Sequence, residues 1–178
     1  DFVSTDIDGN PRTVPVSIGA VEFAQAGEPL IGEYTIDAVG SGERNFISFA
    51  AASEALRLNG VAGKVDFLVA DGTYEEQLNF GTVPGASSEF TVNFKSASND
   101  PLAVVIVHMD TYTMKLDNAE HYSFSELTFR TLGTAQVIQV RNRAVNILFE
   151  SNIIESPSTT NTSEVRGGID VSGTFTEN

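Results

Sequence analysis

The chain contains 178 residues, of which 41% are hydrophobic, and its formal net charge at pH 7 is −14. That length and apolar content can form a folded core, whereas the negative charge argues against binding nucleic acid or anionic lipid. No apolar run approaches the ~20 residues of a membrane-spanning helix, so membrane insertion is not expected. The absence of cysteine excludes disulfides, thiolate metal sites and cysteine nucleophiles.

The first part of the chain predicts turns and one strand. Asp6, Asp8 and Asn10 lie in a turn-rich segment, and hydrophobic residues then alternate over 14–20 as in a half-buried strand. The three oxygen-bearing side chains resemble the start of a calcium-binding loop, but the glycine comes two positions early and no Glu closes the loop. They are therefore weak metal candidates, and a turn is preferred. Residues 24–33, with two glycines and a proline, are expected to be a linker.

One helix is predicted, over residues 49–58. Ser48 is a suitable N-cap, and Asn59 and Gly60 end the helix. The capping box is incomplete, because Ala51 stands where Glu or Gln would be needed. The apolar residues share one face, so the helix is expected to cover other apolar residues.

Only short strands are predicted after the helix. Their spacing leaves no room for crossover helices, which excludes a doubly wound sheet and leaves a sandwich or a solenoid. The expected strands are 65–69, 77–80, 90–95, 104–108, 113–116, 122–124, 127–129, 136–140, 147–149, 152–154 and 169–171.

A repeat of 24–25 residues favours the solenoid. The alternation of large apolar residues over 122–129 recurs 25 residues later over 147–154, so Phe124 should stack on Phe149. Leu116 and Val140 correspond by a shift of 24, and both pairs are expected to be buried. Two apolar pairs separated by a corner describe one coil of a parallel β-helix. Asn152 falls at an inward corner, where its amide should bond to backbone or to a stacked Asn.

The same register predicts which side chains are neighbours on the outer surface. It places Asp117 beside Arg141 and Arg130 beside Glu155, and opposite charges side by side stabilise a sheet. A third outward column contains Lys115, Gln139 and Asp170.

The residues also resemble a known family. Residues 65–78 (VDFLVADGTYEEQL) resemble the first coil of right-handed parallel β-helix proteins of the pectate-lyase-like superfamily, and 46–56 resemble the capping helix of that group. Residues 117–124 and 127–130 resemble later coils. Segments 6–12 and 18–23 resemble the closing segment of another such β-helix. Chains of this kind are typical of large secreted surface proteins of Bacteroidetes-type bacteria.

The resemblance and the repeat together predict an all-β fold, a right-handed parallel β-helix solenoid with one N-terminal capping α-helix. Residues 1–23 would close a preceding β-helix domain, 24–33 would be a linker, and 34–178 would form the capping helix and first coils of a second domain. The chain is thus expected to be an excerpt of a longer protein, with neighbouring β-helix domains as partners and an extracellular or cell-surface location.

The family implies two enzymatic alternatives. A polysaccharide lyase needs a basic residue to remove a proton and carboxylates to hold Ca²⁺. The basic candidates are Lys115, Arg141 and Arg143. The carboxylate candidates are Asp110, Asp117 and Asp170, which form no compact cluster in the sequence. The paired-aspartate and Gly-His-Gly signatures of the polygalacturonase relatives are absent.

A binding or spacing role is favoured over catalysis. The outer surface of stacked strands suits an extended polysaccharide, and Tyr74, Tyr112, Lys115 and Arg141 are weak candidates for its contacts. The expected function is a non-enzymatic extracellular module of an adhesin-like surface protein that spaces or presents binding surfaces. No cofactor is expected, and Ca²⁺ at Asp6, Asp8 and Asn10 is the alternative. The alternative is the N-terminal part of a polysaccharide lyase or glycoside hydrolase with its active site outside this stretch.

Overall fold

The computed structural model describes residues 27–109, 111–133, 136–157 and 168–172. These residues form one helix and fourteen strands arranged in three sheets, and every strand pairing among them is parallel. The predicted segments at 1–23 and the candidates Asp6, Asp8, Asn10 and Asp110 lie outside the described residues. The all-β prediction is confirmed.

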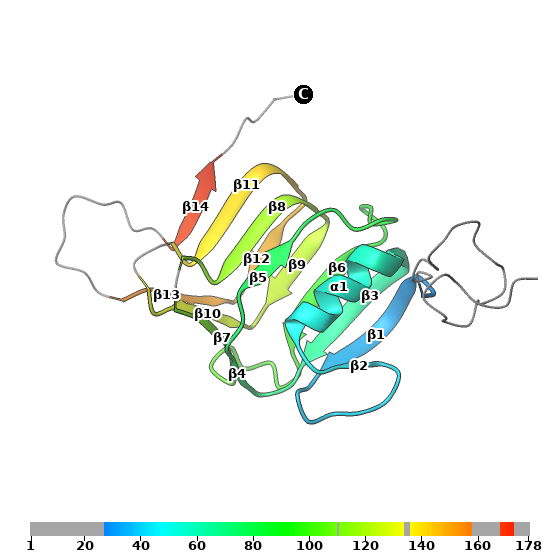
Figure 1. Cartoon of the computed structure of the whole chain (residues 1–178), viewed down its shortest axis with the longest axis horizontal. Coiled ribbons are helices and arrows are strands. Elements are labelled where there is room, and N and C mark those ends of the chain that lie inside the picture. The colour runs from blue at the N-terminus through cyan, green and yellow to red at the C-terminus, as the bar shows by residue number, and fades with distance from the viewer. Residues whose placement is uncertain (1–26, 110, 134–135, 158–167, 173–178) are drawn as a thin grey trace, which may run out of the picture.

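Each sheet takes its strands from separate parts of the chain (Figure 1). The first sheet consists of β1 (Leu30–Ile36), β2 (Asn45–Phe46), β3 (Val61–Val69), β6 (Val92–Ser96), β9 (Tyr122–Ser125) and β12 (Leu148–Glu150). The second consists of β4 (Gly72–Tyr74), β7 (Val104–His108), β10 (Thr128–Thr131) and β13 (Ile153–Glu155). The third consists of β5 (Leu78–Phe80), β8 (Met114–Glu120), β11 (Ile138–Val145) and β14 (Ile169–Ser172).

From β3 onward, the chain visits the first, second and third sheets in a fixed rotation. Three successive strands, such as β9, β10 and β11, therefore form one layer, and four such layers follow one another from β3 to β14. Each strand pairs with the strand of the same sheet in the next layer. This parallel arrangement is consistent with a β-helix-like solenoid.

The predicted register is confirmed across the last three layers. Phe124 pairs with Phe149 and Leu116 pairs with Val140. The spacing between layers is less regular earlier in the chain, where Leu78 pairs with Met114, 36 residues later. Longer connections before β6 and β7 account for the difference.

A column of stacked phenylalanines runs through the core. The register aligns Phe67, Phe94, Phe124 and Phe149, and the distances between successive ring centroids are 4.7, 5.5 and 5.3 Å. The first three rings are fully buried. Phe149 is only half-buried, so the prediction that it would be buried is wrong. Its strand belongs to the last described layer, and among the described residues no further strand pairs with it.

Helix α1 (Phe49–Asn59) closes the opposite end of the core. Ser48 is the N-cap, as predicted, and its hydroxyl accepts a hydrogen bond from the backbone N–H of Ala51 at 3.1 Å. Its apolar face buries Phe49, Ala52 and Leu56. Figure 1 shows the helix lying beside the first layers of strands.

Three strands differ from the sequence-based expectations. Strand β1 occupies residues 30–36, so the linker expected over 24–33 does not extend beyond Pro29. The short strands β2 and β4 were not predicted. Both contain three residues or fewer, too few for an alternating pattern to stand out.

The residues with a left-handed backbone conformation also repeat from layer to layer, both within β8 and β11 and at the corners before β10 and β13. Asn118 and Asn142 both have positive φ angles, of 52° and 54°, and Glu126 and Ser151 have φ of 56° and 54°. The members of each pair are 24 or 25 residues apart, the same interval as the strands. Asparagine adopts the left-handed region more readily than most residues, which suits it to these positions within β8 and β11.

Candidate functional site on the outer face of the third sheet

A ladder of polar side chains runs across the outer face of the third sheet. The register places Asn79 beside Lys115, Lys115 beside Gln139, and Gln139 beside Asp170. The predicted column of Lys115, Gln139 and Asp170 is confirmed, and Asn79 extends it by one strand. We call these four residues the third-sheet ladder. With strands about 4.8 Å apart, the ladder spans roughly 14 Å.

Tyr112 is fixed against this ladder. Its hydroxyl donates a hydrogen bond to Oδ1 of Asn79 at 2.7 Å, and the Lys115 ammonium lies 5.6 Å from the centre of its ring. Gln77 donates from Nε2 to the backbone carbonyl of Tyr112 at 3.1 Å. The structure therefore brings together Tyr112 and Lys115, two of the four predicted contact residues, with two amides that the sequence had not singled out.

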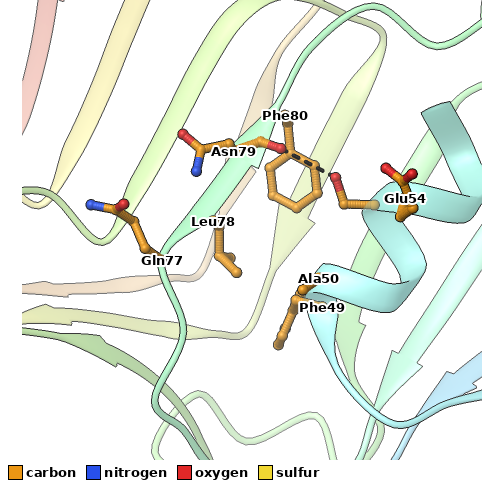
Figure 2. Close-up of a pocket in the computed structure, with 8 residues that line it drawn as sticks. Phe49, Ala50, Glu54, Gln77, Leu78, Asn79 and Phe80 are labelled. Carbon is orange, nitrogen blue, oxygen red and sulfur yellow. Dashed lines mark hydrogen bonds between the residues drawn. The ribbon is translucent and has the colours of Figure 1, made fainter.

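A small cleft adjoins the ladder where β5 meets α1. Its volume is about 190 Å³, and it is lined by Phe49, Ala50, Ser53, Glu54, Gln77, Leu78, Asn79 and Phe80. The Ser53 hydroxyl donates to the backbone carbonyl of Asn79 at 3.1 Å. Leu78 and Phe80 lie toward the helix, whereas the amides of Gln77 and Asn79 point away from it (Figure 2). Asn79 thus belongs to both the cleft and the ladder.

An ion pair lies on the helix side of the cleft, where Glu54 is one of the lining residues. Arg57 donates to both carboxylate oxygens of Glu54, at 2.7 and 2.8 Å. These hydrogen bonds lower the pKa of Glu54 and raise the pKa of Arg57. Both side chains are more than half exposed, so the pair contributes little to stability.

Arg141 lies beside the ladder and forms an ion pair with Asp170. Its Nη2 lies 2.6 Å from Oδ2 of Asp170 in the following layer. The register does place Arg141 beside Asp117, as predicted. Asp117 instead accepts a hydrogen bond from Nδ2 of Asn142 at 2.5 Å. Arg141 therefore neutralises one end of the ladder.

The structure places Tyr74 in the core, so its predicted exposure is wrong. Its side chain is 7% exposed, and its hydroxyl lies 2.9 Å from the carbonyl oxygen of Ala70 and 3.1 Å from that of Ile36. Burial, aided by nearby Asp37, Glu76 and Asp71, raises the pKa of Tyr74 to about 12. The residue packs edge-on against Phe49 and serves the fold.

The residues considered for lyase chemistry are dispersed. Asp117 and Asp170 lie on β8 and β14, with β11 and its Arg141 between them. Arg143 forms an ion pair with Glu120, with an N–O distance of 3.3 Å. Within the described residues, no group of three or more His, Asp or Glu side chains is placed to hold a metal ion.

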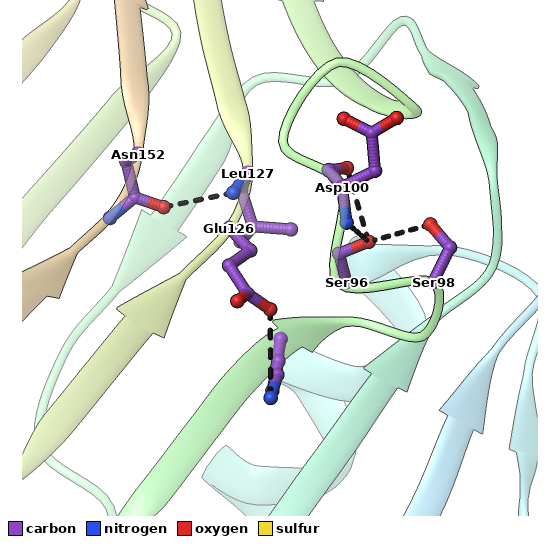
Figure 3. Close-up of polar contacts among 7 residues, drawn as sticks. Ser96, Ser98, Asp100, Glu126, Leu127 and Asn152 are labelled. Atoms are coloured by element: carbon purple, nitrogen blue, oxygen red, sulfur yellow. Dashed lines mark hydrogen bonds and ion pairs between the residues drawn. The ribbon is translucent and has the colours of Figure 1, made fainter.

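A second polar cluster, at the corner between the first and second sheets, holds successive layers together (Figure 3). Asn152 accepts from the backbone N–H of Leu127 at 3.0 Å and donates to the carbonyl of Phe124 at 2.8 Å, which confirms its predicted structural role. One carboxylate oxygen of Glu126 is buried without a hydrogen bond, 3.5 Å from the Lys95 ammonium. This N–O distance is within the range of an ion pair, but it is longer than a usual hydrogen bond.

Ser53, Gln77 and Asn79 were missed by the sequence analysis. Asn79 is 36 residues before its ladder neighbour Lys115, so a search at 24–25 residues could not align them. The alternation Leu78-Asn79-Phe80 was the available signal, because it assigns Asn79 to the outer face.

Comparisons with protein-family models, with curated proteins and with solved structures found no match to this chain. Among the described residues, α1 is the only helix, and it is too short to span a bilayer.

Proposed function

We propose that this chain is a right-handed parallel β-helix module of an extracellular, adhesin-like surface protein, and that it presents the third-sheet ladder to an extended, uncharged glycan. The ladder is the observation that carries the proposal. It aligns amide, ammonium and carboxylate groups on successive strands. The secreted location and the neighbouring β-helix domains as partners rest on the family resemblance of residues 65–78.

The chemistry of the ladder suits sugar hydroxyls. A hydroxyl both donates and accepts hydrogen bonds, and the amides of Asn79 and Gln139 do the same. Lys115 supplies donors only, and the ring of Tyr112 offers an apolar surface held in place by its hydrogen bond to Asn79. Because these groups repeat along the sheet, they favour a linear ligand lying across the strands.

The charge around the ladder favours an uncharged ligand. Lys115 and Arg141 are balanced by Asp117 and Asp170 on the same sheet. The chain as a whole carries −14, so a polyanionic polysaccharide would be repelled. A neutral glycan meets no such barrier.

The spacing role is supported by the core. Four phenylalanine rings stack along the column that joins the layers, and each layer pairs with the next through backbone hydrogen bonds. Such a quasi-one-dimensional stack sets a fixed separation between its ends.

Isothermal titration against neutral polysaccharides and polygalacturonate tests the proposal. Tyr112→Ala and Gln139→Ala should each weaken binding of a neutral glycan by roughly tenfold, about 1.4 kcal/mol. Lys115→Ala should also weaken it. Lys64→Ala is the matched control, because Lys64 is an exposed lysine on β3 of the first sheet. Equal binding by the ladder variants and the wild type, or no binding of any glycan, would overturn the proposed contact surface. Release of reducing ends or unsaturated products would contradict a non-enzymatic role.

A further inference from the structure

The third-sheet ladder ends at an open strand edge beside the cleft. Strand β5 is the outermost strand of the third sheet, and α1 lies next to its free edge (Figure 2). The backbone N–H of Leu78 donates to the carbonyl of Thr113, just before β8, at 2.8 Å. Because alternate residues of a parallel strand turn their backbone groups to opposite sides, the N–H and C=O of Asn79 point away from β8 and toward α1. The Ser53 hydroxyl of α1 donates to that carbonyl at 3.1 Å.

The backbone N–H of Asn79 is an unused donor at this edge. Ser53 satisfies only the carbonyl, and no acceptor among the described residues is paired with the Asn79 N–H. Acceptors line the same cleft. The Ser53 oxygen has given its own hydrogen to Asn79 and keeps lone pairs, and Glu54 carries a carboxylate. A donor and acceptors side by side complement the hydrogen-bonding pattern of an amide.

The walls and the volume of the cleft limit the size of such an amide. The other lining residues include the apolar Ala50, Leu78 and Phe80. Leu78 and Phe80 are 3% and 2% exposed, so they close the cleft toward the core. A volume of about 190 Å³ is the share of roughly six water molecules, at ~30 Å³ each in the liquid. The cleft has room for a carbonyl, an N–H and a methyl group, but not for a segment of polymer.

We propose that the cleft binds the acetamido group of an N-acetylated sugar, so that the ligand of the ladder is an N-acetylated glycan. This inference rests on the proposed glycan contact of the third-sheet ladder. A glycan lying across the ladder passes the edge of β5 at Asn79 and thereby reaches the cleft. The acetamido carbonyl accepts from the Asn79 N–H, its N–H donates to the Ser53 oxygen, and its methyl group contacts Ala50. The group is uncharged, so the −14 charge of the chain does not repel it.

Titration of the 178-residue chain with two uncharged tetrasaccharides, followed by nuclear magnetic resonance, tests the proposal. Tetra-N-acetylchitotetraose and cellotetraose have the same linkage, and each sugar of the first has an acetamido group where the second has a hydroxyl group. The acetylated tetrasaccharide should bind roughly tenfold more tightly, because it adds hydrogen bonds and an apolar contact in the cleft. Equal affinities, with both lost in Tyr112→Ala, would overturn the cleft assignment and leave the ladder as the glycan contact.

Ala50→Leu is the blocking variant. Ala50 is an exposed helical residue, and leucine is a good helix former, so the fold should be retained, as circular dichroism checks. The larger side chain fills the cleft without removing a ladder group, so the two dissociation constants should become equal. Ala97→Leu is the matched control, because Ala97 is an exposed alanine that follows β6 and does not line the cleft. A preference that survives Ala50→Leu, or that Ala97→Leu also removes, would overturn the assignment.

N-methylacetamide separates the cleft from the ladder. This small amide carries the proposed group without a sugar, and it should shift the backbone amide resonances of Ser53 and Asn79 in the wild type but not in Ala50→Leu. Absence of these shifts would overturn the cleft assignment. The same shifts without binding of either tetrasaccharide would overturn the proposed glycan contact. Tighter binding of an acetyl-lysine peptide than of the acetylated tetrasaccharide would overturn the assignment to a sugar.

Discussion

The carboxylate of Glu76 caps the helix that begins at Phe49, 27 residues earlier in the chain. Its two oxygens accept hydrogen bonds from the backbone N–H groups of Phe49 and Ala50, at 3.1 and 2.9 Å. Ser48 caps Ala51 from within the helix sequence. A carboxylate at a helix N-terminus satisfies unpaired donors and interacts favourably with the helix dipole. Glu76, in the loop before β5, therefore provides an acidic group at this helix N-terminus, where the helix sequence itself has Ala51.

Glu76→Ala should lower the free energy of unfolding by about 1 kcal/mol, the usual cost of losing a helix cap. Urea denaturation measures the change. Glu75→Ala is the matched control, because the neighbouring Glu75 is an exposed carboxylate that does not reach the helix. Equal effects of the two substitutions would show that the cap contributes no more than a surface charge.

Phe124→Ala should cost about 3–5 kcal/mol, as expected for a fully buried phenylalanine. Phe149→Ala should cost clearly less, because Phe149 is half-buried although its ring stacks on Phe124 at 5.3 Å. Both values come from chemical denaturation. A larger loss for Phe149 would contradict the observed exposure of the last layer.

A double-mutant cycle should show coupling between Arg141 and Asp170 of up to about 1 kcal/mol, since both side chains are partly exposed. The cycle between Arg141 and Asp117 should give a smaller coupling energy. Those two residues are neighbours in register, but Asp117 bonds to Asn142. A larger coupling to Asp117 would contradict the arrangement of this ion pair.

The free energy of unfolding should fall as pH rises from about 10 to about 12. Burial raises the pKa of Tyr74 in the folded protein to about 12, above its ordinary value of 10.0. The folded state therefore holds the proton more tightly than the unfolded state. The stabilisation that comes from this difference in pKa is fully present below pH ~10 and is lost as pH rises through the folded pKa of Tyr74. Burial also raises the pKa of Tyr122, which acts in the same direction.

Tyr74→Phe should flatten that alkaline decline, as measured by urea denaturation at a series of pH values. It should also reduce stability at neutral pH by about 1 kcal/mol, because the hydroxyl bonds to backbone carbonyls. An unchanged slope between pH 10 and 12 would show that Tyr74 does not ionise differently in the two states.

The repeat in the sequence predicted the later layers well. A shift of 24–25 residues gave the register of β9 with β12 and of β10 with β13, together with the ion pair between Arg130 and Glu155 at 2.6 Å. The helix was predicted to within one residue, because Ser48 and Gly60 mark its ends. These features depend on local patterns or on a constant interval.

The remaining features depend on contacts that no local pattern contains. Tyr74 was assigned to the surface because β4 has three residues, too few for the alternation to fix its face. Strand β1 was not predicted because it contains Gly32, a residue type that is uncommon inside strands. Gly32 has a positive φ of 82° there. Register alone also could not decide whether Arg141 would pair with the preceding or the following layer. Of the candidate site, Lys115, Gln139, Asp170 and Tyr112 were therefore predicted, whereas Asn79 and Gln77 were not.

The pairing of strands across layers has a consequence for how the chain acquires its structure. The register joins residues 23 to 36 positions apart, so strand pairing brings together distant segments and should make folding slow. Each layer nevertheless needs only the layer before it as a template. Helix α1 and β3 come early in the sequence, so a chain leaving the ribosome can add layers in the order in which they are synthesised.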